Sequence, residues 1–323
     1  MKKATALLYG TILWLGTAAP CQGFGSGDRG TAGAQFLKIG PGARPAGMGE
    51  AFSAVADDVH AIYYNPAGLA ALKSVEVTGM HNEHFQDVDY EFAAVAVPLL
   101  RWTSTRKDSN AYGVLGFSVT NLSVGRIERR GLTETDTPDS SFGANDFAYS
   151  LAYAYAFPYT GLSLGGAAKY VESDIDTVHA GAVAADLGAL YRMDLMALSF
   201  GVRHLGTEQR FSHMSDPLPT TMFAGASYRF STKLMGALEA TVPRDGNPRL
   251  AAGGEYRHAF NKEVRGAVRA GYTSPISRST TAGGLYGGTF GLGMGFGRFS
   301  FDFAWLPFGD LGNSFRYSLH VKF

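Results

Sequence analysis

The sequence is poor in three features whose scarcity narrows the class of protein: cysteine, net charge and long apolar runs. Cys21 is the only cysteine in 323 residues, so no intramolecular disulfide can form. Basic and acidic residues number 28 each, a balance that removes the electrostatic case for nucleic acid as a partner. After residue 23 no apolar run approaches the roughly 18 residues that a transmembrane helix needs. A membrane-spanning form of this chain must therefore be a closed β-barrel, because only helices and closed barrels satisfy the backbone in a bilayer.

The first residues have the pattern of a secretory signal peptide. Two lysines precede an apolar run, Ala4–Ala18, that is too short to span a bilayer. A lipoprotein signal needs a small residue before its cysteine, and Pro20 before Cys21 argues against lipidation. We expect a signal peptide over 1–23, a periplasmic lead-in and luminal plug over 24–73, and a barrel over 74–323.

One long segment, Gly40–Leu72, has helical character. Its apolar residues recur at spacings of three and four, which indicates a helix with one face toward a wall. These residues are Met48, Ala51, Phe52, Val55 and Val59. Asp57 and Asp58 are disfavoured at a helix C-terminus and are interpreted as N-caps of a second short turn. Asn65 and Pro66 suit the cap and first position of a third. The segment predicts a helical plug.

Everything after about Val75 has the composition of β-strands and tight turns, with 42 Gly, 16 Tyr and 22 Phe in the chain. About fourteen antiparallel strands are expected, many of them long enough to cross a bilayer at a tilt. They are placed near 75–81, 89–99, 111–122, 145–157, 161–172, 179–193, 196–204, 220–230, 232–242, 249–259, 262–273, 284–296, 298–306 and 315–323. Short turns follow the even strands, and longer loops such as Ser123–Asn145 and Gly206–Pro219 follow odd ones. This asymmetry is typical of periplasmic turns and external loops, with Leu100–Asn110 as the exception.

Alternation within the strands separates a large aromatic face from a face of small residues. From Phe147 to Phe157 every second residue is Phe, Tyr or Leu, and those between are Ala or Ser. A soluble β-sandwich, the alternative fold, would carry polar residues on its second face, whereas small side chains suit a crowded lumen. The last strand is amphipathic and ends on Phe323, like the assembly signal of bacterial outer-membrane barrels.

Several charged residues face the lumen by the same alternation. They are Lys169, Asp186, Arg203, Glu239, Glu255, Arg257, Arg265, Arg269 and Asp302, and the plug adds Arg44, Glu50, Asp57 and Asp58. One interpretation is a mutually neutralised network that holds the plug, because unpaired buried charge is costly. The other is a passage for an amphiphile whose head group meets Arg203 or Arg269.

The sequence contains no convincing catalytic or metal-binding pattern. His81 and His84, near Asp87 and Asp89, fall on opposite faces of an extended strand, and nothing orients them. No G-x-S-x-G elbow is present. The alternating glycines of 291–297 precede no helix and are interpreted as space for the plug beside the wall. We expect a protein that is not an enzyme and uses no cofactor or metal.

Short motifs spread over the mature chain carry a family resemblance. The N-terminal group consists of ARPAGMG from Ala43, ADD from Ala56 and YNPAG from Tyr64; later stretches are ADLGALY from Ala185, FGVR from Phe200, GGEY from Gly253 and WLPFGDLG from Trp305. Together they resemble PorV/PorQ-type outer-membrane proteins, relatives of the FadL-like long-chain fatty-acid transporters. The resemblance implies a fourteen-stranded barrel with an N-terminal plug. Its plug motif corresponds to Arg44, Asp57, Asp58, Asn65, Pro66 and Gly68.

The resemblance also implies two alternative functions. The PorV branch is implicated in type IX secretion, so the preferred hypothesis is a barrel that engages secreted cargo or partner proteins at the cell surface. Phe211 and Met214, in an external loop, are its candidate anchors. The alternative is a FadL-like transporter of hydrophobic small molecules or fatty acids. Either way we expect a multi-pass protein of the cell outer membrane, whose partners are membrane lipid and the assembly machinery. Secreted cargo proteins are a further partner under the preferred hypothesis.

Overall fold

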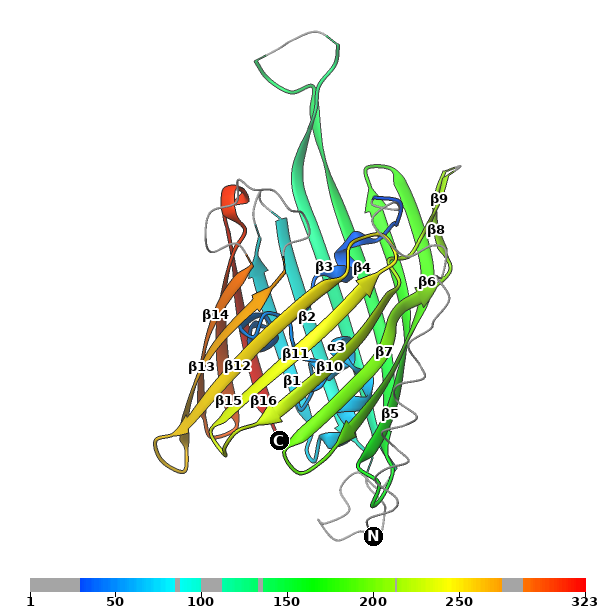
Figure 1. The fold of residues 1–323 in the computed structure, drawn as a ribbon. Coiled ribbons are helices and arrows are strands. Elements are labelled where there is room, and N and C mark those ends of the chain that lie inside the picture. The colour runs from blue at the N-terminus through cyan, green and yellow to red at the C-terminus, as the bar shows by residue number, and fades with distance from the viewer. Residues whose placement is uncertain (1–29, 85–87, 100–111, 133–135, 213, 275–286) are drawn as a thin grey trace.

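The computed structural model describes residues 30–84, 88–99, 112–132, 136–212, 214–274 and 287–323. The expectations for the signal peptide, Cys21, Asp87 and Leu100–Asn110 concern residues outside this part. Within it, fourteen antiparallel strands close into a barrel in the order β1-β16-β15-β14-β13-β12-β11-β10-β7-β6-β5-β4-β3-β2 (Figure 1). The expected fourteen-stranded barrel is therefore confirmed.

The barrel strands coincide with the expected segments to within a few residues at most boundaries. They are β1 Glu76–Glu83, β2 Val88–Pro98, β3 Val114–Arg129, β4 Ser140–Ala156, β5 Leu162–Ile175, β6 Val178–Arg192, β7 Met196–Gly206, β10 Thr221–Arg229, β11 Leu234–Pro243, β12 Arg249–Ala259, β13 Val264–Thr273, β14 Gly288–Phe296, β15 Phe299–Pro307 and β16 Asn313–Lys322. A separate hairpin, β8 Glu208–Phe211 and β9 Met214–Pro217, lies between β7 and β10.

The two ends of the barrel differ. We call the end with the short connections 157–161, 193–195, 230–233, 260–263 and 297–298 the turn end, and it also carries the C-terminus (Figure 1). The opposite end is the loop end. There β3 and β4 continue far beyond the neighbouring strands as a two-stranded ribbon.

Two hairpins at the loop end were not predicted from the sequence: the extension of β3 and β4, and the β8–β9 pair. The expected loop Ser123–Asn145 is mostly strand, because after a bulge β3 and β4 pair again through Ile127 and Phe142. The Arg129 guanidinium lies 5.4 Å from the Phe142 ring centroid and forms an ion pair with Asp176, which ties the ribbon to the β5–β6 turn. Within the expected loop Gly206–Pro219, β8 pairs with β9.

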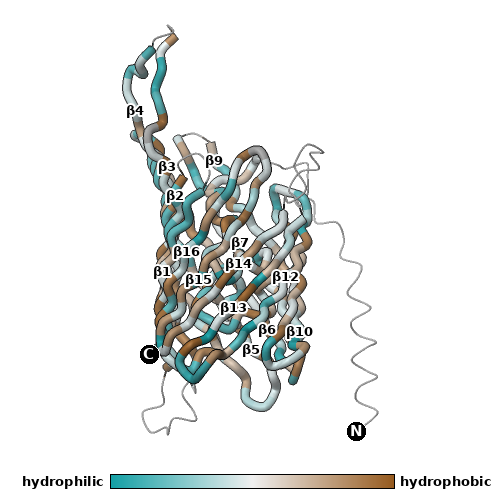
Figure 2. The backbone as a smooth tube through the Cα atoms, turned by 90° about the vertical axis from the view of Figure 1, so that its left-hand side faces the viewer, coloured by the Kyte–Doolittle hydropathy of each residue, from teal (hydrophilic) through white to brown (hydrophobic). Residues whose placement is uncertain are grey.

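The outer face of the wall is apolar and exposed. Figure 2 shows hydrophobic and hydrophilic residues alternating along the strands. Large outward side chains remain uncovered, among them Phe200 at 67% and Leu250 at 66% of full exposure. The inner face carries small residues, as the alternation predicts. The chain therefore does not form the soluble sandwich that was considered as the alternative.

Residues 36–72 lie inside the barrel, but not as a long helix (Figure 1). Their helices are the short α2 Ala43–Gly47 and α3 Ala61–Tyr64, with 3-10 turns η2 Gln35–Lys38 and η3 Pro66–Ala71; a further 3-10 turn, η5 Gly309–Leu311, precedes β16. No helix in the described ranges is long and apolar enough to cross a membrane. The expected continuation of α2 fails because Gly49 and Glu50 both adopt a φ of 65°. The backbone turns there against the wall, where a Cβ on Gly271 would lie 2.1 Å from the Gly49 nitrogen.

Small wall residues allow this close packing. A Cβ on Gly165 would lie 2.4 Å from the backbone nitrogen of Ala67, and one on Gly291 would lie 3.0 Å from the Gly47 Cα. The interpretation of the glycines in 291–297 as space for the plug thus holds at Gly291. At Gly293 the space is instead filled by the Arg269 and Asp302 side chains.

Candidate functional site

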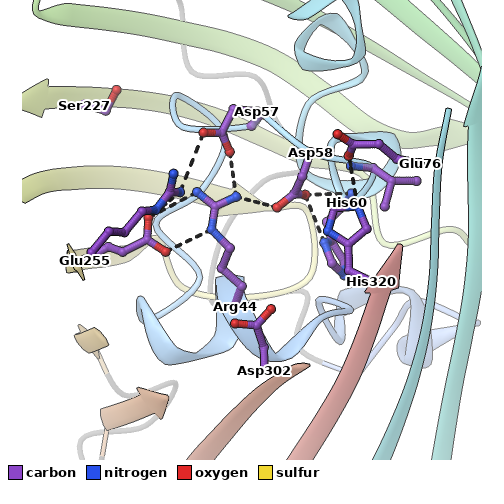
Figure 3. Close-up of polar contacts among 12 residues, drawn as sticks. Arg44, Asp57, Asp58, His60, Glu76, Ser227, Glu255, Asp302 and His320 are labelled. Carbon is purple, nitrogen blue, oxygen red and sulfur yellow. Dashed lines mark hydrogen bonds and ion pairs between the residues drawn. The ribbon is translucent and has the colours of Figure 1, made fainter. Parts of the chain in front are cut away.

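The central charge of the turn-side half of the lumen is Arg44 of α2 (Figure 3). Its Nη1 donates to Asp57 at 2.6 Å and also to Asp58. Its Nε donates to Glu255 on β12 at 3.0 Å, and Nη2 to the other oxygen at 3.2 Å. One buried arginine thus binds two carboxylates of its own segment and one of the wall.

Glu255 extends this network along the wall. Its carboxylate also forms ion pairs with Arg257 at 2.5 Å and with Arg269 at 2.6 Å. Arg269 then binds Asp302 on β15 at 2.6 Å. The sequence-predicted lumen residues Glu255, Arg269 and Asp302 therefore form one continuous ionic network with the plug motif.

Asp58 connects the network to a histidine pair. It accepts from the backbone and ring nitrogens of His60, both at 2.9 Å, and the rings of His60 and His320 are 6.4 Å apart (Figure 3). Burial alone would raise the pKa of Asp58, yet His60 and Arg44 together lower it well below the ordinary carboxyl value. Asp58 is therefore held as a carboxylate inside the lumen.

The remaining plug-motif residues are structural. Asn65 caps η3, since its Oδ1 accepts from the Ala67 nitrogen at 3.1 Å, and Pro66 follows at the first position, as predicted. The Asn65 amide also donates to the Ala189 carbonyl of β6 at 3.2 Å. Gly68 is required by space, because a Cβ there would lie 2.3 Å from the Ala56 oxygen.

A second cluster surrounds Arg203 on β7. Its nearest carboxylate is Glu239, with 3.5 Å between Nη2 and Oε1, and its Nε has no hydrogen-bond partner among the described residues. The guanidinium lies 5.2 Å from the Tyr63 ring centroid and 4.9 Å from that of Phe223. Arg203 is therefore buried among aromatic faces with part of its donor capacity unused.

Next to Arg203 the wall bulges. Between Ala185 and Leu187 the β6–β7 register shifts, and His204 adopts a φ of 59°. Asp186 stabilises this conformation by accepting from the His204 backbone nitrogen at 2.8 Å, and it pairs with Lys169 at 2.5 Å. Lys169 and Asp186, both predicted to face the lumen, are thus paired with each other.

Two adjoining cavities lie above the network, on the loop side. The larger, which we call the vestibule, has a volume of about 550 Å³ and a mostly apolar surface. Its apolar lining comes from Ile39, Pro243, Leu306, Phe308 and Leu311. The smaller holds about 30 Å³ beside Tyr63, Arg203 and Glu239. Glu50 and Arg249 line both cavities, so the vestibule adjoins the cavity that Arg203 lines.

The segment before the plug lies at the loop end. Gly33 donates its backbone N–H to the Pro217 carbonyl at 3.0 Å. Gln35 and Lys38 bind Asp245, in the β11–β12 connection, at 2.7 and 2.9 Å. The described residues of the expected lead-in, 30–33, therefore lie beside the β8–β9 hairpin at the loop end. Lys38 also lines the vestibule, so the segment before the plug forms part of the lining of this cavity.

The other sequence-predicted residues lie outside the lumen core. Arg265 is exposed at the turn end, where it donates to the Gly297 carbonyl at 2.9 Å. Phe211 and Met214 sit at the tip of the β8–β9 hairpin, with Met214 72% exposed. Phe323 follows β16 and is exposed at the turn end. The structure thus separates Arg203, beneath the vestibule, from Arg269 in the plug network.

Sequence reasoning overlooked several residues of the site. Tyr63 and Tyr64 both line the smaller cavity, and the Tyr64 hydroxyl has no hydrogen-bond partner in the described part. Arg316 binds Glu50 at 3.2 Å between the cavities. Arg316 faces the lumen by strand alternation, the signal that could have identified it. Arg249 makes no ion pair within the described ranges.

His81 and His84 do not converge. His81 faces outward and contacts Glu91 at 2.6 Å, whereas the ring of His84 contacts Ser314 at 3.1 Å. Across the described residues, no group of three His, Cys, Asp or Glu side chains is arranged to hold a metal ion.

Several solved structures have a similar fold. The toluene transporter TodX of Pseudomonas putida is 10% identical, aligned over 81% of this chain and 91% of TodX, with a TM-score of 0.51. The monoaromatic hydrocarbon channel CymD is also 10% identical, aligned over 88% of this chain and 97% of CymD, with a TM-score of 0.56. A FadL homologue of Pseudomonas aeruginosa is 12% identical, aligned over 93% of this chain and 99% of the homologue, with a TM-score of 0.51. At such identities the likeness shows the fold alone, and it confirms the FadL-like architecture.

Sequence comparison supplies the family. No curated protein sequence matches the chain. The comparisons do not confirm a place among PorV/PorQ-type proteins. Residues 15–204, more than half of the chain, match a family described as "Uncharacterised protein family (UPF0164)". The chain belongs to the UPF0164 family and has the FadL-like barrel fold of outer-membrane-type channels.

Proposed function

We propose that this protein is an outer-membrane channel for hydrophobic small molecules, with the loop end outside the cell and the turn end in the periplasm. The vestibule is the observation that carries the proposal. It is an apolar cavity of about 550 Å³ in the loop-end half of a barrel, a size typical of small-molecule sites. Two of the structures with this fold, TodX and CymD, are a toluene transporter and a monoaromatic hydrocarbon channel, which supports the same function.

Arg203 gives the passage a polar step. A ligand that leaves the vestibule toward the smaller cavity meets the partly unpaired Arg203 guanidinium between aromatic rings. An amphiphile such as a fatty acid would place its head group there. Arg269 is unsuited to this role because Glu255 and Asp302 already occupy it.

The secreted-cargo hypothesis has weaker support. Met214 is exposed, as a docking residue must be, but two apolar side chains on a hairpin of two four-residue strands offer a small anchor. The structural neighbours are transport channels. We therefore prefer transport, which was the second alternative from the sequence.

The test is uptake through the vestibule. Purified protein in liposomes is assayed for entry of toluene and of a fluorescent fatty-acid analogue. Leu311→Glu places a charge in the apolar vestibule and should reduce uptake about tenfold, since transferring a hydrophobic ligand past an ionised group is unfavourable. Leu132→Glu makes the same change on the exposed ribbon and should have no effect. Equal uptake by both variants would exclude the vestibule as the entrance.

A further inference from the structure

Four arginines converge on the turn-end mouth of the barrel. Arg192, Arg229, Arg257 and Arg265 lie at or near the turn-end termini of β6, β10, β12 and β13. Each follows the inward parity of its strand: Ser227, two residues before Arg229, donates to the Ala54 carbonyl in the plug, and Arg269, four after Arg265, is buried. Arg229, Arg257 and Arg265 are exposed and Arg192 is half-buried, so solvent reaches this face.

These arginines are mostly not neutralised. Arg192 donates to the Ala56 carbonyl at 3.0 Å, and Arg265 donates to a backbone carbonyl too. The Arg229 side chain makes no ion pair or hydrogen bond with any residue that the structure describes. Only Arg257 contacts carboxylates, Glu255 and Asp57, and both of these already bind Arg44.

The adjoining turns add to the excess of positive charge. The described turn-end connections carry three cations, Lys233, Lys262 and Arg298, and two carboxylates, Asp194 and Glu263. The half-exposed Asp57 is the plug's contribution beside Arg257. An uncompensated cationic surface of this kind attracts and steers anions.

The spacing of the four side chains indicates the size of the anion. Successive strands are about 4.8 Å apart, so residues two strands apart, such as Arg192 and Arg229 or Arg229 and Arg257, are separated by about 10 Å. The whole arc, five strand spacings from β6 to β13, measures about 24 Å. A single carboxylate reaches only one or two of these groups. A polypeptide in the polyproline II conformation advances about 9 Å per turn of three residues and places every third side chain on one face, so acidic residues at that interval can meet successive arginines.

The orientation of the arc excludes bilayer lipid as the occupant. The outward neighbours on the same strand ends are aromatic: Tyr228 and Phe230 beside Arg229, and Tyr256 beside Arg257. By alternation the four arginines instead lie on the lumen side of their strands, and Arg192 and Arg257 contact the plug. We propose that the turn end of this barrel is a docking site for an acidic, extended segment of another polypeptide, held by Arg192, Arg229, Arg257 and Arg265.

The experiment measures binding of a fluorescently labelled hexaglutamate peptide to the purified full-length protein in a neutral detergent, by fluorescence anisotropy. Binding is expected at low salt and should weaken steeply as salt rises. Arg229→Gln combined with Arg265→Gln should weaken it about tenfold, as two exposed charge contacts are lost. Neither residue binds a carboxylate, so the plug network is untouched.

The matched control is Arg210→Gln with Arg244→Gln, the same change of charge on exposed residues of the loop end. It should bind the peptide like the parent protein, and unheated gel mobility verifies that both variants fold. Three results would overturn the proposal: no binding by the parent, equal loss in both double variants, or binding indifferent to salt. Displacement of the peptide by equimolar dodecanoate would also overturn it, showing an exit site for small anions.

Discussion

Arg44 in α2 and Glu255 on β12 are joined by two hydrogen bonds, of 3.0 and 3.2 Å, across 211 residues of sequence. This pair links a segment of short helical turns to the wall of the barrel. The same guanidinium binds Asp57 and Asp58, so its loss would leave three carboxylates short of a partner.

Replacing Arg44 with methionine should therefore strongly destabilise the protein. Removing one member of a buried ionic group costs about 3–5 kcal/mol, because the remaining charges stay buried. Urea unfolding followed by gel mobility measures the change. Arg130→Gln, which breaks the exposed pair with Glu128, should cost no more than about 1 kcal/mol. A similar loss in both variants would contradict a special role for Arg44.

Acidification should loosen the plug through Asp58. Its pKa is lower in the folded than in the unfolded chain, so the folded state binds fewer protons. The stabilisation is fully present above the ordinary carboxyl value of 3.8 and is lost as the pH falls through the lowered folded value. We expect the urea midpoint to fall on acidification, and to fall less in Asp58→Asn. An unchanged slope in that variant would locate the acid sensitivity elsewhere.

Deleting Gly42–Leu72 should open the lumen. The segment fills the barrel interior, and the wall behind it carries buried charges such as Glu239 and Arg269 that would become hydrated. Ion conductance in planar bilayers should rise markedly over that of the intact protein. Equal conductance, with the deleted form still folded, would show that the segment does not block the passage.

Arg203→Ala should distinguish transport from partner capture. If a ligand head group meets Arg203, uptake of the fatty-acid analogue should fall about tenfold, whereas uptake of toluene should change little because it has no charged group. The combined Phe211→Ser and Met214→Ser variant should transport both normally. Loss of secreted-protein binding in this hairpin variant, with normal uptake in Arg203→Ala, would restore the cargo hypothesis.

Removing Phe323, or replacing it with aspartate, should reduce assembly. Its exposed ring ends the last strand, where outer-membrane barrels carry their recognition signal. The measurement is the fraction of protein whose gel mobility depends on heating, from fractionated cells. Leu132→Asp, an equally polar change on the ribbon, serves as the control. Equal assembly of the Phe323 and Leu132 variants would show that the terminal aromatic is dispensable here.

The strands could be predicted because their pattern is local. Residues 145–157 and 298–306 alternate between large and small side chains with a period of two, which is visible without knowledge of their surroundings. Regular turn sequences divide the remaining strands from one another. The ribbon of β3 and β4 could not be predicted from the sequence, because beyond Val124 it has no buried face that would impose an alternation of apolar and polar residues. Ile127 and Phe142 stabilise it as one cross-strand pair.

The plug could not be predicted at the same level because its conformation depends on the wall. The spacing of Met48, Phe52 and Val55 is helical, yet Gly49 and Glu50 turn where the wall backbone at Gly271 approaches. Alternation likewise indicated that Arg203 and Arg269 face inward. It could not show that Arg269 is fully paired and Arg203 is not, since that depends on residues from β7, β11, β12 and β15 meeting in space.

The pairing of β1 with β16 constrains how the molecule can form. The first and last strands meet at this seam, and the plug precedes both in the chain. The cylinder can close only after the final strand has been made, so the wall around the plug is complete only when both ends of the barrel sequence are present. Assembly of the barrel thus depends on joining the two strands of the wall that lie farthest apart in the sequence.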